Sequence, residues 1–181
     1  MIQPQRIKLL NRLPVRKGRY VLYWMQASQR AEWNHALEFA AGQANDLDLP
    51  LIVLFVLTDR FPEANLRHYT FMLEGLQEVH AALEKRGIQF ILRRGEMEQE
   101  VLLMAAEAAA VVADRGYLRI QKAWRRNVAD HAPCRMTEVE TDAVVPVEEA
   151  LNREAYSAAV LRPHIKRRLP EFLVSLPETP V

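Results

Sequence analysis

Glycine, cysteine and long apolar runs are all scarce in this chain of 181 residues. Its six glycines never form Gly-x-Gly-x-x-Gly or Gly-x-x-x-x-Gly-Lys-Ser/Thr, so the usual sequence signatures of dinucleotide and triphosphate binding are missing. The single cysteine, Cys134, excludes an internal disulfide and a cysteine zinc cluster, and it suits a reducing compartment. The five histidines are scattered without the spacing of metal ligands, so no metal site is predicted.

An excess of charge of one sign is also lacking, because the chain has 24 basic and 23 acidic residues. A dedicated nucleic-acid domain usually carries a clear basic excess, so strong unaided DNA binding is not expected. The longest apolar run, residues 49–57, contains a proline and is too short to cross a bilayer. We therefore expect a cytoplasmic protein with no membrane partner. Since no Ser-His-Asp arrangement can be proposed either, the sequence predicts no catalytic residue of its own.

What the chain does contain is a series of apolar runs that alternate with helical patterns. Five strands are predicted, over residues 20–25, 51–57, 88–92, 111–113 and 136–140. Helices are predicted over residues 31–45, 66–86, 96–109 and 119–130. This alternation is typical of an α/β fold, here a Rossmann-like doubly wound domain with a five-stranded parallel sheet over residues 1–147. Trp33 is predicted on the buried face of the first helix, and Phe71 and Met72 in the core.

The pattern changes over residues 148–181, which we expect to form a connecting segment. A short helix is predicted over residues 148–159, and residues 161–172 contain a basic cluster that runs from Arg162 to Arg168. A solvated helix face explains such a cluster, and contact with a partner domain or a phosphate backbone is the alternative.

Polar side chains follow the first and fourth predicted strands. In open α/β sheets, ligands bind beyond the carboxyl ends of the strands, where the strand order reverses. A flat apolar ligand at such a crevice would lie against apolar side chains while polar groups orient it. The candidate binding residues are Trp24, Met25, Gln26, Gln29, Arg30, Asp114 and Arg115. Purely structural roles are the alternative: Trp24 would end a core strand, Ser28 would cap the next helix, and Arg30 and Asp114 would form an ion pair.

Several spaced motifs resemble the class II cyclobutane pyrimidine dimer photolyases over most of residues 19–173. The motifs are Tyr23-Trp24-Met25, Gln29-Arg30, Arg67-His68-Tyr69, Phe71-Met72-Leu73, Trp124-Arg125 and Arg162-Pro163. The resemblance implies the N-terminal α/β domain of that family, or a stand-alone relative of it, which can hold an antenna chromophore, typically a deazaflavin, in its crevice. It also implies that FAD binds only to a helical C-terminal domain outside this chain, that this domain is the partner, and that DNA is contacted only through the complete protein.

Two other hypotheses stay open at this point. The chain could be a small nucleotide- or flavin-binding module of the same architecture, although the absent phosphate loops count against that. It could also be an interaction protein that docks a helical partner through residues 162–172.

Overall fold

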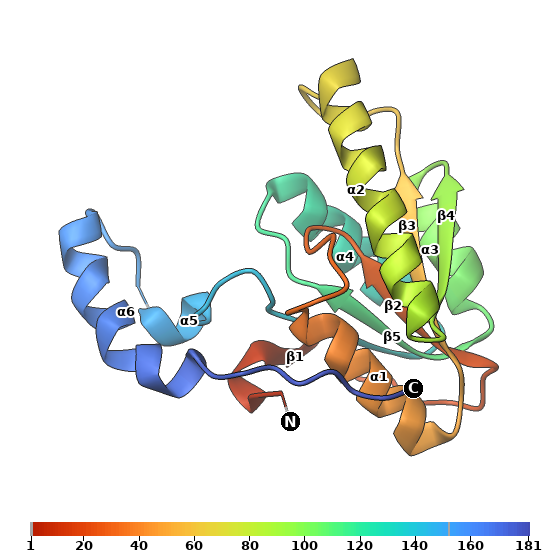
Figure 1. Ribbon diagram of the computed structural model, residues 1–181, viewed down its shortest axis with the longest axis horizontal. Coiled ribbons are helices and arrows are strands. Elements are labelled where there is room, and N and C mark those ends of the chain that lie inside the picture. Colours follow the sequence, from red (N-terminus) through yellow and green to blue (C-terminus); the bar gives the residue numbers. More distant parts are fainter. Residues whose placement is uncertain (1, 152) are drawn as a thin grey trace.

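Six strands form one sheet in the order β1-β6-β5-β2-β3-β4, in a computed structural model that describes residues 2–151 and 153–181 (Figure 1). The strands are β1 (Ile7–Leu9), β2 (Tyr20–Met25), β3 (Leu51–Leu57), β4 (Gln89–Arg94), β5 (Ala108–Asp114) and β6 (Arg135–Val139). Strands β2 to β6 pair in parallel, as predicted, whereas β1 pairs antiparallel with β6. The predicted count of five strands is therefore wrong by one. The missed strand β1 has three residues with one lysine among them, too few for a hydrophobic pattern.

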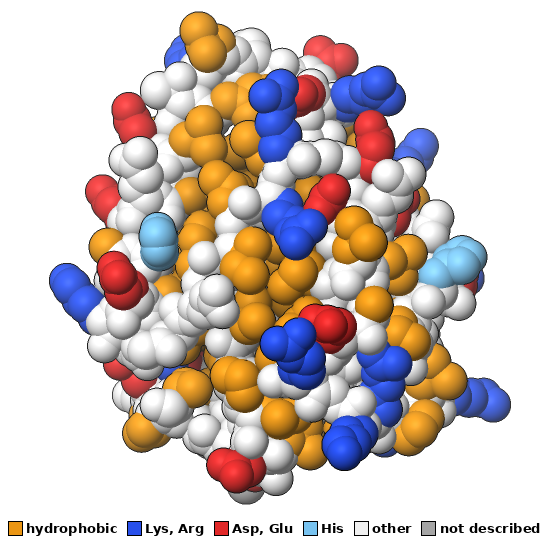
Figure 2. All heavy atoms as spheres, turned by 90° about the vertical axis from the view of Figure 1, so that its right-hand side faces the viewer, with side chains coloured by type: hydrophobic (Ala, Val, Ile, Leu, Met, Phe, Trp, Pro, Cys, Tyr) orange, Lys and Arg blue, Asp and Glu red, His pale blue; other side chains and the backbone are white. Residues whose placement is uncertain are grey.

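The centre of the sheet explains the unbroken apolar runs in the sequence. Every residue of β2 and of β5 is buried, because helices cover both faces of these strands. The edge strand β4 is more exposed, and its two arginines form ion pairs, Arg93 with Glu100 and Arg94 with Asp59. Figure 2 views the side of the molecule on which β4 lies and shows charged side chains dispersed over its apolar surface. Such charges discourage edge-to-edge association of sheets.

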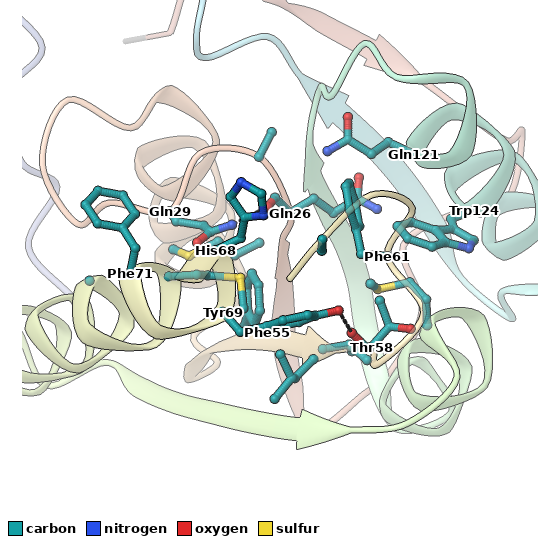
Figure 3. Close-up of a pocket in the computed structure, with 18 of the residues that line it drawn as sticks. Gln26, Gln29, Phe55, Thr58, Phe61, His68, Tyr69, Phe71, Gln121 and Trp124 are labelled. Carbon is teal, nitrogen blue, oxygen red and sulfur yellow. Dashed lines mark hydrogen bonds between the residues drawn. The ribbon is translucent and has the colours of Figure 1, made fainter. Parts of the chain in front are cut away.

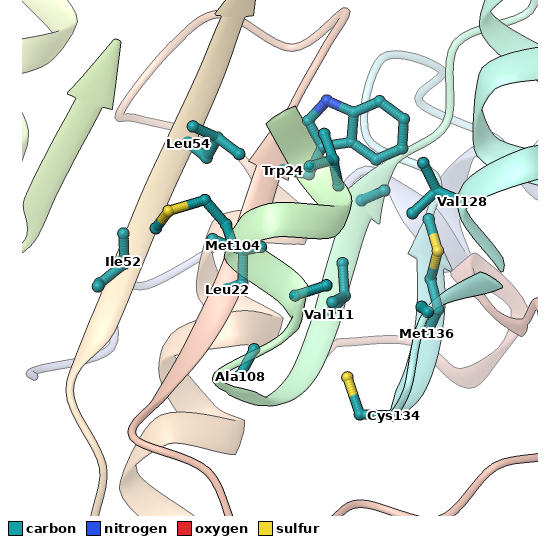
Figure 4. Packing of buried hydrophobic residues seen from close by; sticks show 14 of the residues in the cluster. Leu22, Trp24, Ile52, Leu54, Met104, Ala108, Val111, Val128, Cys134 and Met136 are labelled. Carbon is teal, nitrogen blue, oxygen red and sulfur yellow. The ribbon is translucent and has the colours of Figure 1, made fainter. Parts of the chain in front are cut away.

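Two pairs of helices enclose the sheet. Helices α1 (His35–Leu47) and α2 (Leu66–Lys85) contribute to the core on one face, and α3 (Met97–Ala105) and α4 (Arg119–His131) to the core on the other. Figure 4 shows the second core, in which Trp24 lies between Leu54 and Met104 on one side and Val128 on the other.

Three sequence predictions about the helices are wrong or need correction. Helix α1 begins at His35 rather than at residue 31, because Asn34 caps it by accepting the backbone N–H of Leu37. Trp33 precedes this cap with a φ of 52° and is 61% exposed, so it is not on the buried face. The first turns of α2 extend beyond the sheet (Figure 1), which leaves Phe71 80% exposed rather than in the core.

The segment after β6 folds as two helices and an extended tail. Helix α5 (Val147–Ala150) is shorter than predicted, and α6 (Ala158–Phe172) begins where Ser157 accepts the backbone N–H of Val160. Asn152, inside the predicted helix over residues 148–159, lies outside the described residues. Phe172 packs with Val145 and Ala150 in a small separate cluster.

The tail after α6 returns along α1 (Figure 1). The amide of Asn45 donates to the carbonyl oxygen of Pro180 at 2.7 Å, and the backbone N–H of Thr179 donates to Glu38, which also pairs with Arg86. These contacts hold the tail against the α1 side of the domain. Across residues 2–151 and 153–181, the structure contains no helix with the length and apolar character needed to cross a membrane.

Candidate functional site

A cavity of about 920 Å³ opens at the carboxyl ends of β2 and β3, between α2 on one side and α4 on the other. Its floor is formed by residues that end or follow these strands, among them Met25, Gln26, Phe55 and Thr58. One face of α2 contributes Tyr69, Met72 and Gly75, three positions spaced by three residues. The cavity thus lies at the carboxyl edge of the parallel sheet, which is the edge at which open α/β sheets bind ligands.

Aromatic side chains dominate the wall of this cavity. Phe61, in the loop between β3 and α2, packs on Trp124 of α4 with ring centroids 6.2 Å apart and an angle of 57° between the rings. The hydroxyl of Tyr69 donates to the carbonyl oxygen of Thr58 at 2.7 Å, which fastens the loop to α2. Figure 3 shows Phe61, Trp124 and Tyr69 around one space. Rings presented in this way provide apolar faces against which a flat molecule can stack.

Two glutamines from the loop after β2 supply amide groups to the cavity. The side-chain nitrogen of Gln29 donates to the backbone carbonyl of Gln26 at 3.2 Å. The side-chain oxygen of Gln26 accepts a hydrogen bond from Arg125 at 3.2 Å, while its nitrogen is buried and has no partner among the described residues. Gln26 is 8% exposed. The floor of the cavity therefore holds one amide whose donor is unused.

Asp114, at the end of β5, fixes the shape of that loop without reaching the cavity. Its carboxylate accepts the backbone N–H groups of Gln26, Ala27 and Ser28 at 2.6, 2.6 and 2.8 Å. Burial raises the pKa of Asp114, and the three N–H donors oppose that shift. Because the loop folds over this carboxylate, the crevice expected between the ends of β2 and β5 is closed, and the cavity opens between β2 and β3 instead.

Two of the structural alternatives are wrong. Arg30 pairs with Asp142 at 2.7 Å and not with Asp114. Ser28 does not cap α1, since its hydroxyl donates to Asp142 at 2.8 Å. The third alternative is correct, because Trp24 is fully buried in the core shared with α3 and α4.

The seven predicted binding residues divide into two groups. Met25, Gln26, Gln29 and Arg30 line the cavity. Trp24, Asp114 and Arg115 do not, and Arg115 is engaged by Glu140 at 2.9 Å and by Glu148 at 2.6 Å. Whether the first group binds a ligand remains a prediction.

The sequence analysis missed the aromatic half of the cavity. Phe61, Tyr69 and Trp124 come from the loop before α2, from α2 itself and from α4. The available signal was the resemblance, since Tyr69 and Trp124 belong to the motifs that carry it. Their apolar periodicity alone indicated only helix packing.

Comparisons with known proteins agree with this architecture. A protein-family model for DNA photolyase matches residues 21–181. A deoxyribodipyrimidine photo-lyase of Methanothermobacter thermautotrophicus is 50% identical over 177 residues, which are 97% of this chain and 40% of that protein. The corresponding protein of Arabidopsis thaliana is 32% identical over 190 residues, 98% of this chain and 37% of its own length.

A solved structure shares the fold at low sequence identity. The archaeal photolyase of Sulfolobus tokodaii, described with two FAD molecules, superposes with a TM-score of 0.68 at 18% identity over 87% of this chain and 36% of that one. The chain spans about two fifths of the length of the curated relatives that it matches. The match of the family model over residues 21–181, together with these relatives, shows that the chain belongs to the DNA photolyase family.

Proposed function

We propose that this chain is the N-terminal α/β domain of a class II deoxyribodipyrimidine photolyase and that its cavity holds an antenna chromophore of the deazaflavin or flavin type. The observation that carries the proposal is the aromatic cavity of about 920 Å³ at the carboxyl ends of two central parallel strands. That volume lies at the upper end of the range for small-molecule sites, roughly 300–1,000 Å³, and suits a three-ring chromophore with a side chain.

The residues present fit such a group. Phe61 and Trp124 offer ring faces, Met25 and Met72 offer polarizable apolar contacts, and the unused amide donor of Gln26 offers one hydrogen bond. The Sulfolobus tokodaii photolyase is described as implying a novel light-harvesting cofactor, which supports testing flavins beside deazaflavins.

In this role the bound chromophore would absorb light and pass its excitation on. The chain's own residues would stack against the rings, orient them through Gln26 and exclude water through the Phe61 loop. No acid, base or nucleophile is required of the chain.

The remaining assignments of the proposal follow from the family. Residues 1–147 form the antenna domain, and residues 148–181 connect it to a helical domain that binds FAD and the damaged DNA. A net charge of +1 is consistent with DNA contact only through the complete protein. The lone cysteine suits the cytoplasm.

Gly75 permits a sharp test, because it lines the cavity and a Cβ added there meets no atom within 4 Å. Replacing this helical glycine with leucine should stabilise α2 by about 0.5–1 kcal/mol while its side chain enters the cavity. Ala81→Leu, on an exposed part of the same helix, is the matched control.

The measurement is quenching of tryptophan fluorescence, to which Trp124 in the cavity wall contributes, during titration with 5-deazariboflavin, riboflavin and AMP. We expect the wild type and Ala81→Leu to bind a deazaflavin or flavin and Gly75→Leu to bind neither, although it stays folded. Equal affinity in all three proteins would show that the ligand does not occupy this cavity. Binding of AMP alone would favour a nucleotide-binding module.

A further inference from the structure

The unused donor of Gln26 lies in an amide whose orientation is set by its neighbours. Arg125, which is 4% exposed, donates through Nη1 to the Gln26 oxygen, through Nε to Glu138 at 3.1 Å and through Nη2 to the carbonyl oxygen of Gly116 at 2.7 Å. A guanidinium has only donors, so a flipped amide would turn two N–H groups toward it and lose the bond. Arg125 therefore directs the oxygen of Gln26 toward itself and leaves the nitrogen free.

The backbone of Gln26 is held equally firmly. Its N–H donates to Asp114 at 2.6 Å, and the next two N–H groups bind the same carboxylate. Since both ends of the residue are fixed, the amide nitrogen cannot easily turn to another acceptor of the protein. A buried donor without a partner destabilises the domain, so an acceptor that pairs with it contributes to ligand affinity.

The side chain that carries the free nitrogen lies at the aromatic end of the cavity. Gln26, Phe61 and Trp124 line the same space, and Figure 3 shows the side chain of Gln26 extending toward the side where the two rings lie. The nitrogen exposes less than 1 Å² to solvent, so an acceptor reaches it only when the side chains around it rearrange.

We infer that Gln26 is the residue that selects the ligand of this cavity, by donating its Nε2 hydrogen bond to a carbonyl oxygen or ring nitrogen of a flat, aromatic molecule that binds beside Phe61 and Trp124. The inference rests on the proposed function and narrows it, because a ring that presents only donors or only C–H groups at this point would leave the amide unpaired. Arg125 acts as a positioning residue for Gln26.

A glutamine outside the cavity allows a matched test. Gln26→Met removes the free donor, whereas Gln77→Met removes an exposed amide of α2 that does not line the cavity. Gln26→Glu is the second variant, since a carboxylate still accepts from Arg125 but offers no donor, so the local fold is kept.

Affinity for 5-deazariboflavin and riboflavin, both of which carry ring carbonyls, should fall about tenfold in Gln26→Met and Gln26→Glu and stay within about twofold in Gln77→Met. The carbonyl stretching band of the bound ring should rise in frequency in the two Gln26 variants only. If the wild type binds these rings but the Gln26 and Gln77 variants behave alike, the role of Gln26 is overturned while the cavity stands. If the wild type binds neither ring, the proposed function and this inference fall together.

Discussion

Asp114 offers the most direct way to perturb the loop that shapes the cavity. The substitution Asp114→Asn replaces a carboxylate that accepts three backbone N–H groups by an amide with one acceptor oxygen. If that oxygen keeps the bonds to Ala27 and Ser28, the new NH₂ group must face the N–H of Gln26. At least one buried donor then loses its acceptor.

The size of the effect follows from these contacts. Hydrogen bonds to a charged group contribute about 1.5–3 kcal/mol each, so three of them sum to roughly 5–9 kcal/mol. Part of this gain is offset because Asp114 is fully buried, and burial opposes its charge, as the raised pKa shows. Since Asp114→Asn keeps some of the bonds and removes the buried charge, we expect the free energy of unfolding to fall by about 2–3 kcal/mol.

Asp142→Asn is the matched control. Asp142 contacts Ser28 and Arg30 of the same loop, but its side chain is 34% exposed, so its loss should cost under about 1 kcal/mol. Urea unfolding followed by circular dichroism gives both values, and amide exchange should accelerate at residues 26–28 in Asp114→Asn only. Equal stability of the two variants, with unchanged exchange at these amides, would refute the anchoring role of Asp114.

Three further predictions concern pH, packing and the connecting segment. Burial, aided by nearby arginines, lowers the pKa of His35 from 6.5 to about 4, so the folded state resists protonation. The free energy of unfolding should therefore fall as the pH drops from 6.5 to 4, by at most about 1.4 kcal/mol per pH unit, and urea titrations should show a smaller fall for His35→Asn. Gly18→Ala would force a Cβ into the backbone of Ala109 and should lower the melting temperature by several degrees, whereas Gly42→Ala, with open space in α1, should raise it. The buried carboxylate of Glu140 accepts hydrogen bonds from Arg115, from a tyrosine hydroxyl and from the backbone N–H that starts α5. Glu140→Gln should therefore speed limited proteolysis between residues 144 and 157, and an unchanged digestion rate would contradict this.

The central strands could be predicted from the sequence because their physical requirements are local. Strands β2, β3 and β5 are covered on both faces, so their residues must be apolar over the whole length, and this pattern is visible in the chain. Strand β1 could not be predicted, because it is defined by its pairing with β6, for example Ile7 with Val139, and that pairing exists only after the chain has folded. Trp33 was misplaced for a similar reason, since a left-handed residue before the cap of α1 leaves no mark in hydrophobic periodicity.

The cavity could be predicted only in part. The rule that ligands bind at the carboxyl ends of parallel strands placed Met25, Gln26, Gln29 and Arg30 at its edge. The same rule wrongly included Asp114, because it does not show that backbone N–H groups of the facing loop will bind this carboxylate. The contact of Phe61 with α4 was not predictable, since it depends on how a loop packs across the sheet.

The central claim is that a flat chromophore occupies the cavity between α2 and α4. A crystal structure of the chain soaked with 5-deazariboflavin tests it most directly. We predict electron density for the ring between Met72 on one side and the Phe61–Trp124 pair on the other, with a ring acceptor about 3 Å from the side-chain nitrogen of Gln26. Ring density elsewhere on the domain, with this cavity filled only by water, would contradict the account.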